Sequence, residues 1–362
     1  MRPTLKPGLR RFWRDQSTFQ IGLDPDRAVL VTGADAGAWK FVSALDGTRD
    51  RDAVLAMARR HGIRKAHAAA LLDELTAKGL LDDATTDSSV LQRLSLDERD
   101  RLRPDLAAIS LQSGRPDAGL GVLQQRRSAV VEVHGCGRVG ASVARLLAAA
   151  GVGCVVPRDD ALVRPDDLAP AGHGSRDRGA TRERALARAL QAEFPTVSTR
   201  LPRGKRLPDL VILAPADTLE AADRDVFLRQ GVPHLYARVR ETRGLVGPLV
   251  LPGRSSCQRC HDHHMTDRDP GWPYLVAELV SPAKRSVDAC DVVLATMVAA
   301  HTALQALAFL QGEIPSSVDS MWEITLPDGV MYQRTWGPHP RCGCVWPAAR
   351  VSGEAALAAD AA

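Results

Sequence analysis

The feature that most constrains the fold is a glycine-rich turn that separates an apolar run from a helix-forming segment. Residues 128–133 are mostly valine and alanine and predict a buried strand. The sequence GCGRVG follows at residues 135–140, and residues 141–150 then predict a helix. A strand, the pattern G-x-G-x-x-G and a helix in this order predict the start of a Rossmann-like domain that binds a nucleotide.

Each glycine of the turn has an expected role. Gly135 permits the tight bend, Gly137 lets a phosphate approach the backbone, and Gly140 lets the helix pack against the strand. The N-terminus of the helix then presents N–H groups and partial positive charge to an anion. The turn is therefore expected to hold the phosphates of a nucleotide.

A second strand and an acidic residue complete the predicted nucleotide site. Residues 153–156 form another apolar run, and Asp159 follows them. A carboxylate about 20 residues beyond the glycines can accept a hydrogen bond from a ribose hydroxyl. Arg138 stands inside the turn, so a Rossmann fold whose pocket holds no nucleotide remains the alternative.

Two close pairs of cysteines predict a metal site. Cys257 and Cys260 form the first pair, and Cys342 and Cys344 form the second. Each pair can chelate an ion from a single turn, and two pairs complete the four-sulfur shell of a structural zinc, Zn²⁺. Such an ion would fasten the C-terminal segment to the domain and contribute to folding. Four separate thiols, or ligands from nearby histidines, remain alternatives; these histidines are His261, His263, His264 and His339.

Composition narrows the class of protein. Residues 1–14 lack the apolar run of a signal peptide, so a cytoplasmic protein is expected, and there paired cysteines favour metal over disulfide. The net charge of +4 is too small to favour nucleic acid as a partner. Residues 292–310 are apolar and long enough for a membrane span. Their polar residues and the lack of a basic flank favour a buried core helix, so no membrane contact is expected.

The order of these features resembles the ThiF/MoeB family of ubiquitin-activating-type proteins. The resemblance covers residues 120–348 and includes the glycine-rich turn, both cysteine pairs and the long apolar helix. It implies an α/β fold with a Rossmann-like ThiF/MoeB-type domain and a structural zinc. It also implies adenylation, in which a C-terminal carboxylate attacks the α-phosphate of ATP beside Mg²⁺.

The resemblance also implies roles for individual residues. The three glycines of the turn would hold phosphate, and Asp159 would hold the ribose. Arg182 stands where the family has a phosphate-binding lysine, and Asp217 stands near the family's magnesium aspartate.

Three departures from the family pattern bear on activity. Arg138 occupies a place where the family usually has glycine. Residues 166–172 lack the asparagine and the catalytic arginine of the family. Arg182 keeps the charge of a lysine but not its geometry. These departures predict an adenylation site that is reduced or inactive.

Residues 1–85 predict a small α+β domain of winged-helix-like arrangement. Two apolar runs separated by turn-forming Asp24-Pro25-Asp26 predict a hairpin, and three helical patterns follow. The hairpin strands are expected at 19–23 and 28–31, and the helices at 36–45, 50–61 and 64–81.

Residues 18–82 also resemble the PqqD-like domains that recognise leader peptides of ribosomally made natural products. The resemblance implies that a leader adds as a strand along residues 28–32, beside a helix at 65–78. A DNA-binding winged helix would need a cationic recognition helix, but residues 67–78 contain one lysine and two acids. An accessory dimerisation module is a further alternative.

The chain is thus predicted to contain a PqqD-like domain (1–85), a linker (86–125), a ThiF-like domain (126–350) and a disordered tail (351–362). Two functions fit this organisation. In the first, the protein binds a precursor leader peptide and presents it to a modifying enzyme such as a cyclodehydratase. In the second, it is an active adenylyltransferase for a peptide or sulphur-carrier carboxylate. The resemblance also implies a homodimer.

Overall fold

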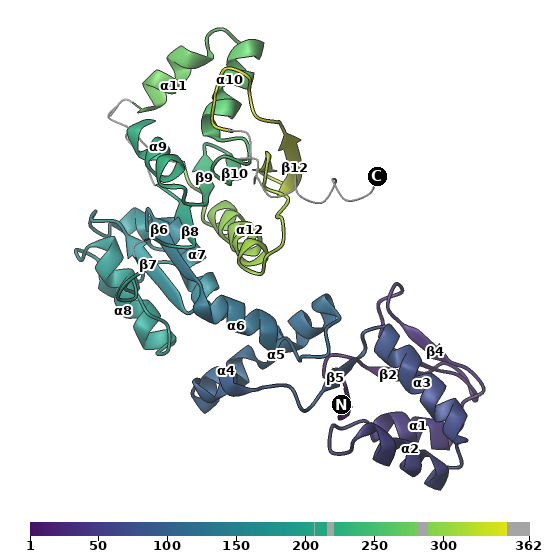
Figure 1. Ribbon diagram of the computed structural model, residues 1–362. Coiled ribbons are helices and arrows are strands. Elements are labelled where there is room, and N and C mark those ends of the chain that lie inside the picture. Colours follow the sequence, from purple (N-terminus) through teal and green to yellow (C-terminus); the bar gives the residue numbers. More distant parts are fainter. Residues whose placement is uncertain (206, 216–220, 281–288, 346–362) are drawn as a thin grey trace, which may run out of the picture. The chain divides into compact units, whose positions relative to one another are not determined.

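The computed structural model describes residues 1–205, 207–215, 221–280 and 289–345 (Figure 1). The chain divides into two compact units, Met1–Ser128 and Ala129–Ala362. Each unit has its own hydrophobic core, so each is described by itself.

The first unit begins with a small antiparallel sheet and three helices. The sheet has the order β2-β3-β4, so β4 lies at one edge. Alternate residues of β3 and β4 are buried against the helices. This matches the hairpin and three helices expected from the sequence. The elements are β2 (Arg11–Trp13), β3 (Phe19–Ile21), β4 (Val29–Val31), α1 (Ala36–Ser43), α2 (Arg51–Arg60) and α3 (Lys65–Ala77).

The segment expected to be a linker contributes three helices to the first unit. They are α4 (Ser89–Gln92), α5 (Leu96–Ser113) and α6 (Leu120–Ser128). They bury a small core of their own, which includes Leu102 and Leu123. The end of α5 is also tied to the pair of strands β1 (Pro3–Leu5) and β5 (Leu81–Asp83), because Lys6, next to β1, donates to Ser110.

The second unit is built on one seven-stranded sheet with the order β12-β11-β10-β9-β8-β6-β7. Strands β7, β6, β8 and β9 are parallel, as in a Rossmann-like fold, and β10 to β12 continue the sheet antiparallel. The strands are β6 (Val130–His134), β7 (Cys154–Arg158), β8 (Leu210–Leu213), β9 (His234–Arg240), β10 (Arg243–Val250), β11 (Ser320–Thr325) and β12 (Val330–Thr335).

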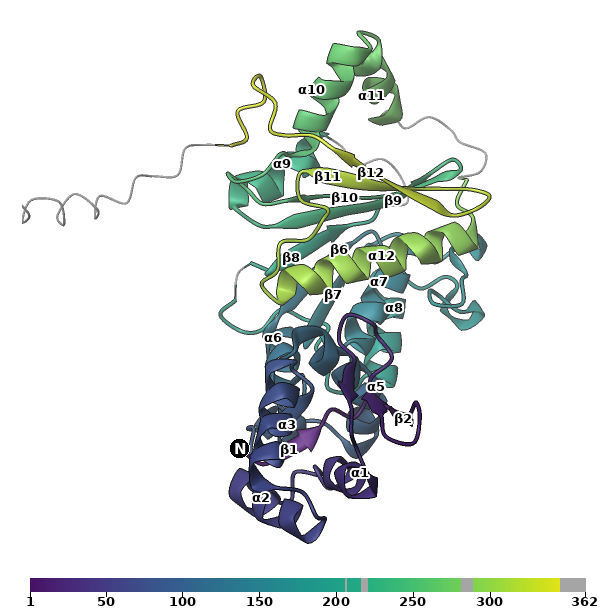
Figure 2. The same ribbon diagram turned by 90° about the vertical axis from the view of Figure 1, so that its right-hand side faces the viewer.

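Helices cover the sheet and carry the candidate sites. Two of them, α7 (Arg138–Ala149) and α12 (Val292–Leu310), pack side by side on one face, as Figure 2 shows. The remaining α-helices are α8 (Arg182–Glu193), α9 (Ala221–Gln230), α10 (Gln258–Arg268) and α11 (Trp272–Val280).

The apolar helix predicted over residues 292–310 is α12. By length and composition it is the one helix of the described residues that could cross a membrane. Leu294, Val298 and Ala306 are fully buried, and they belong to the core beneath the sheet. The helix therefore acts as a core element of the second unit.

Candidate functional site

The glycine-rich turn joins β6 to α7 through two positions that require glycine. Gly135 has a φ of 84°, and a Cβ there would lie 2.3 Å from the carbonyl oxygen of Ala214. A Cβ on Gly140 would lie 1.8 Å from the carbonyl oxygen of Gly135, so α7 packs directly on the turn. Gly137 is the N-cap of α7, with an extended backbone. The roles expected of Gly135 and Gly140 thus have a steric basis.

Asp159 follows β7, and its carboxylate faces the turn. Its Oδ2 accepts a hydrogen bond of 2.7 Å from the backbone N–H of Cys136. Its Oδ1 accepts one of 3.0 Å from the backbone N–H of Ala161. The side chain is only 10% exposed. The carboxylate predicted to hold a ribose is therefore bound to amides of the protein, including the amide of the turn.

Arg182 is the first residue of α8 and lies buried beside Asp159. Its Nε and Nη2 donate to the two oxygens of Asp167 at 2.9 and 2.7 Å, and its Nη1 donates to Asp159 at 3.4 Å. Burial disfavours the charged guanidinium, but the hydrogen bonds and charge of Asp167, with those of Asp159, outweigh it and raise the pKa of Arg182. Each nitrogen of the fork is thus directed at a carboxylate.

These three side chains together carry one positive and two negative charges. One guanidinium faces two carboxylates, and the side chains of Arg182 and Asp167 are each only 6% exposed. Solvent screens such buried charges weakly. The residues predicted to attract phosphate therefore form a closed ion-pair network.

Arg138 and His173 hold the rest of the turn. Arg138 donates through Nε to the carbonyl oxygen of Asp166 at 2.5 Å and through Nη1 to that of Cys290 at 2.6 Å. The Nε2 of buried His173 lies 2.7 Å from the carbonyl oxygen of Cys136. The arginine inside the turn therefore links two loops of the second unit.

The predicted magnesium aspartate, Asp217, lies outside the described residues. Strand β8, which leads towards it, is present and fully buried. The Mg²⁺ role of Asp217 accordingly stays a prediction.

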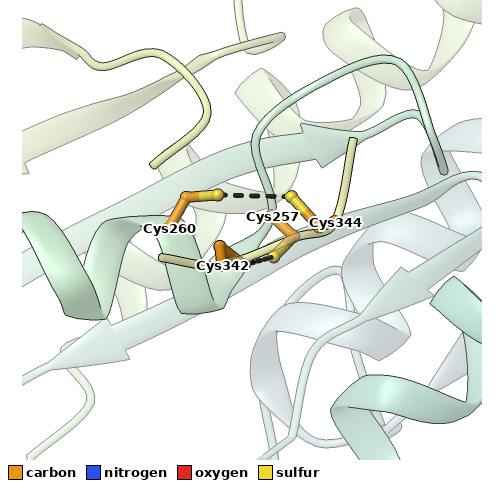
Figure 3. A group of neighbouring side chains, drawn as sticks. All are labelled: Cys257, Cys260, Cys342 and Cys344. Atoms are coloured by element: carbon orange, nitrogen blue, oxygen red, sulfur yellow. Dashed lines mark hydrogen bonds between the residues drawn. The ribbon is translucent and has the colours of Figure 1, made fainter. Parts of the chain in front are cut away.

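The two cysteine pairs meet at one place, where the start of α10 approaches the chain after β12 (Figure 3). The Sγ atoms of Cys257 and Cys342 are 3.4 Å apart, and those of Cys260 and Cys344 are 3.3 Å apart. All four sulfurs lie within 4.8 Å of one another. Sulfurs around a tetrahedral zinc are about 3.8 Å apart, given Zn–S bonds of about 2.3 Å. The four thiols therefore fit a metal ion with a complete sulfur shell.

The surroundings of the cysteine cluster suit a closed structural site. Cys257, Cys260 and Cys344 are buried, and the backbone N–H of His339 donates to the Sγ of Cys260 at 3.2 Å. The hydrogen bond with Cys257 lowers the pKa of Cys260. The nearby histidines make other contacts, such as the 2.8 Å pair between the Nε2 of His339 and Asp267. Among the described residues, only the four cysteines form a group able to hold a metal ion.

Asp167 is the functional residue that the sequence prediction missed. The stretch 166–172 was expected to lack two family residues, but an acid that would pair with Arg182 was not expected. A signal did exist: two adjacent acids, Asp166 and Asp167, precede Arg182, which the resemblance implies stands in place of a lysine. An acid and an arginine introduced into one site can form a bidentate salt bridge.

Comparisons with known proteins bear on the family and the fold of this chain. The model of the ThiF family matches residues 110–344, well over half of the chain. A search of curated protein sequences finds no match.

Solved structures are similar over nearly the whole chain. E. coli MccB with ATP has a TM-score of 0.70 and 15% identity, covering 96% of this chain and 100% of that one. The microcin C7 biosynthetic enzyme MccB with N-formylated MccA has a TM-score of 0.69 and 15% identity, covering 95% and 99%. PaaA has a TM-score of 0.67 and 17% identity, covering 91% and 98%. At such identities the likeness concerns the fold, and the family match establishes that this chain belongs to the ThiF family.

Proposed function

We propose that this protein binds a precursor leader peptide through its first unit and presents it to a modifying enzyme, such as a cyclodehydratase, without activating ATP itself. The observation that carries the proposal is the pairing of Arg182 with Asp167 at 2.7 and 2.9 Å. Arg182 is the residue that the resemblance implies would bind phosphate, and its guanidinium already donates to both oxygens of Asp167.

An ATP phosphate would have to displace Asp167 from Arg182. Leaving one partner of a buried ion pair uncompensated costs about 3–5 kcal/mol. The carboxylates of Asp159 and Asp167 would also repel a triphosphate. Both effects disfavour nucleotide binding at this turn.

One amide of the turn, that of Cys136, is also paired with a carboxylate. The N–H of Cys136 donates to Asp159, so an anion there would compete with an existing charge-assisted hydrogen bond. A turn that keeps its glycines but has its amide and its cation paired internally serves as a scaffold.

The first unit offers an edge for peptide capture. Strand β4 lies at the edge of its sheet, with Val29 and Val31 buried and Leu30 48% exposed between them. An extended peptide can pair its backbone with such an edge. MccB, whose fold is similar over 95% of this chain, was solved with the peptide MccA. The PqqD-like resemblance supports the same role for this unit.

Zinc is the metal we assign to the cysteine cluster. Four thiolates are soft ligands, and a tetrahedral four-sulfur shell is typical of zinc or of iron–sulfur centres. In the proposed function, the ion fastens the loop that contains Cys342 and Cys344 to the start of α10. It then maintains the shape of the second unit and takes no part in chemistry.

The second candidate function is an active adenylyltransferase that uses ATP and Mg²⁺. The observation in its favour is the intact turn, in which Gly135 and Gly140 keep the close packing of a phosphate-binding loop. Arg182 and Asp217 would then act on the phosphates and the metal, once Arg182 is released from Asp167.

Isothermal titration of Mg-ATP into the purified, zinc-loaded protein distinguishes the two functions. We expect no detectable binding and no ATP–pyrophosphate exchange, because the cation and the amide of the turn are paired internally. Micromolar binding that Asp159→Ala abolishes, together with exchange, would establish the adenylyltransferase and overturn the proposal.

A further inference from the structure

The first unit contains a pocket of about 520 Å³ that the proposed function has not used. Four segments line it: the connection between β1 and β2, the connection between β3 and β4, the end of α3, and the last turn of α5. The fourth segment belongs to the stretch that was predicted to be a linker.

The wall contributed by α5 is held firmly in place. A Cβ on Gly79 would lie 2.9 Å from the carbonyl oxygen of Gly114, so the ends of α3 and α5 touch through their backbones. Lys6, 1% exposed, donates to the carbonyl oxygens of Ser110 and Arg115 at 2.7 and 2.6 Å. The pocket is therefore formed before any ligand arrives, which favours binding.

The pocket combines an apolar lining with a cationic rim. Leu9, Leu23, Leu80 and Leu111 line it, and Leu23 is 66% exposed. An apolar lining of this kind suits a bulky aliphatic side chain, and the volume leaves room for the neighbouring residues of a peptide.

The charged residues of the lining are three cations and one acid, namely Arg10, Arg27, Lys78 and Asp24. Arg27 lies 3.9 Å from Asp24 and also donates to the carbonyl oxygen of Leu111. Arg10 and Lys78 are exposed and leave an excess of positive charge. The rim therefore complements an acidic ligand.

The position of the pocket links it to the edge strand. Arg27 lies two residues before Val29, the first residue of β4. A peptide paired along β4 and continuing past Val29 would reach the pocket within a few residues, since a strand advances about 3.3 Å per residue.

We propose that this pocket anchors one bulky aliphatic side chain of an acidic segment in the bound peptide, with α5 forming part of the binding site. This inference rests on the proposed function and adds the chemistry of the peptide that is recognised. Strand pairing along β4 supplies backbone contacts, and the pocket selects the side chain.

Fluorescence polarisation on the full-length, zinc-loaded protein tests the anchor. The probes are short fluorescein-labelled peptides of alternating glutamate and alanine with a central leucine, and matched peptides with serine for leucine or glutamine for glutamate. We expect the acidic leucine peptide to bind about tenfold or more tightly than the serine peptide. The glutamine peptide should bind several-fold more weakly at low salt.

Variants of pocket residues show whether the peptide binds at the pocket. Leu23→Asn and Leu111→Asn should each weaken binding of the leucine peptide about tenfold, whereas Leu96→Asn should leave it unchanged. Leu96 is the control because it lies on the same helix as Leu111 and is 73% exposed. Thermal melting confirms that each variant is folded.

Failure of the anchor can be told apart from failure of the proposed function. If Leu30→Asn, on the edge of β4, weakens binding but Leu23→Asn and Leu111→Asn do not, peptide capture stands and the anchor is wrong. If the acidic leucine peptide binds no better than its serine counterpart, the anchor is also wrong. If none of the peptides binds, the inference falls, while the Mg-ATP titration still tests the second unit independently.

Discussion

Each unit of this protein contains a buried cation, and the two cations have different surroundings. Lys6 in the first unit forms an ion pair of 3.0 Å with Asp82 and donates to oxygens of Ser110 and Arg115. Arg182 in the second unit faces two carboxylates, Asp159 and Asp167.

The difference shows what each cation does. Lys6 is balanced by one carboxylate and by carbonyl oxygens at the end of α5, where the helix dipole is negative. It joins β1, β5 and α5 and has no charge left over. Arg182 is more than balanced, at the position that the family resemblance implies would bind phosphate. In the proposed function, the first cation is structural and the second closes the nucleotide site.

The largest expected effect is loss of stability in the second unit alone, after a change in the cysteine cluster. Cys257→Ser should remove the bound zinc and unfold the second unit, because structural zinc contributes about 10–16 kcal/mol of binding free energy that is linked to folding. Elemental analysis should show one zinc per chain in the wild type and none in the variant. Hydrogen exchange should rise in β6 and stay low in β3. Cys290→Ser is the control, and unchanged metal content in Cys257→Ser would refute the site.

The next effect tests the structural cation. Lys6→Met leaves the buried carboxylate of Asp82 without its partner and should lower the free energy of unfolding of the first unit by about 3–5 kcal/mol in urea. Arg51→Met removes an exposed pair with Asp73, whose side chains are 41% and 65% exposed, and should cost at most about 1 kcal/mol. Equal losses in the two variants would contradict the structural role of Lys6.

His234 is a third buried basic side chain, and it differs from Lys6 and Arg182 because it stays neutral. Desolvation lowers the pKa of His234 to about 4, although its hydrogen bond to the carbonyl oxygen of Val232 partly opposes this. Between pH 6.5 and 4, this histidine is protonated in the unfolded chain, where its pKa is near 6.5, but neutral in the folded protein. Stability is therefore full above pH 6.5 and falls by up to about 3 kcal/mol towards pH 4.

Urea unfolding as a function of pH checks this expectation. His234→Gln should flatten the decrease between pH 7 and 4, and His67→Gln, on an exposed face of α3, should not. A decrease that is the same in wild type and His234→Gln would assign the pH dependence to other groups.

A smaller change in stability than that of Lys6→Met is expected at Asp167. Replacing it with asparagine keeps an acceptor for Arg182 but removes one charge, and Asp159 remains as the counter-ion. We expect a loss of about 1–3 kcal/mol, measured by urea unfolding. A loss as large as that of Lys6→Met would show that the Arg182 network is mainly structural.

The parts of the candidate site that could be predicted from the sequence are those that depend on residues close together in the chain. The turn at Gly135 and Gly140 and the cysteine pairs depend on residues that are close in the chain, so their spacing indicates their chemistry. The direction of the Arg182 fork depends on a loop fifteen residues earlier that contains Asp167, and no local pattern determines it.

The helices of the predicted linker were expected only in part, as a possible helix over residues 94–106, for a similar reason. Much of α5 is charged and includes Pro104, so its apolar periodicity is weak. Ser95 and Glu98 form a capping box that marks the start of this helix, and that signal was available. Its packing against β1 and β5 depends on Lys6, about a hundred residues away.

The central claim is that Asp167 is paired with Arg182, the cation that the family resemblance implies would bind phosphate. Isothermal titration of Mg-ATP into Asp167→Asn tests it most directly, with the neighbouring Asp166→Asn as control because the Asp166 side chain is 60% exposed. The account predicts that Asp167→Asn gains ATP binding while the wild type and Asp166→Asn show none. Equal binding by all three proteins, or no binding by Asp167→Asn when melting shows it folded, would contradict the account.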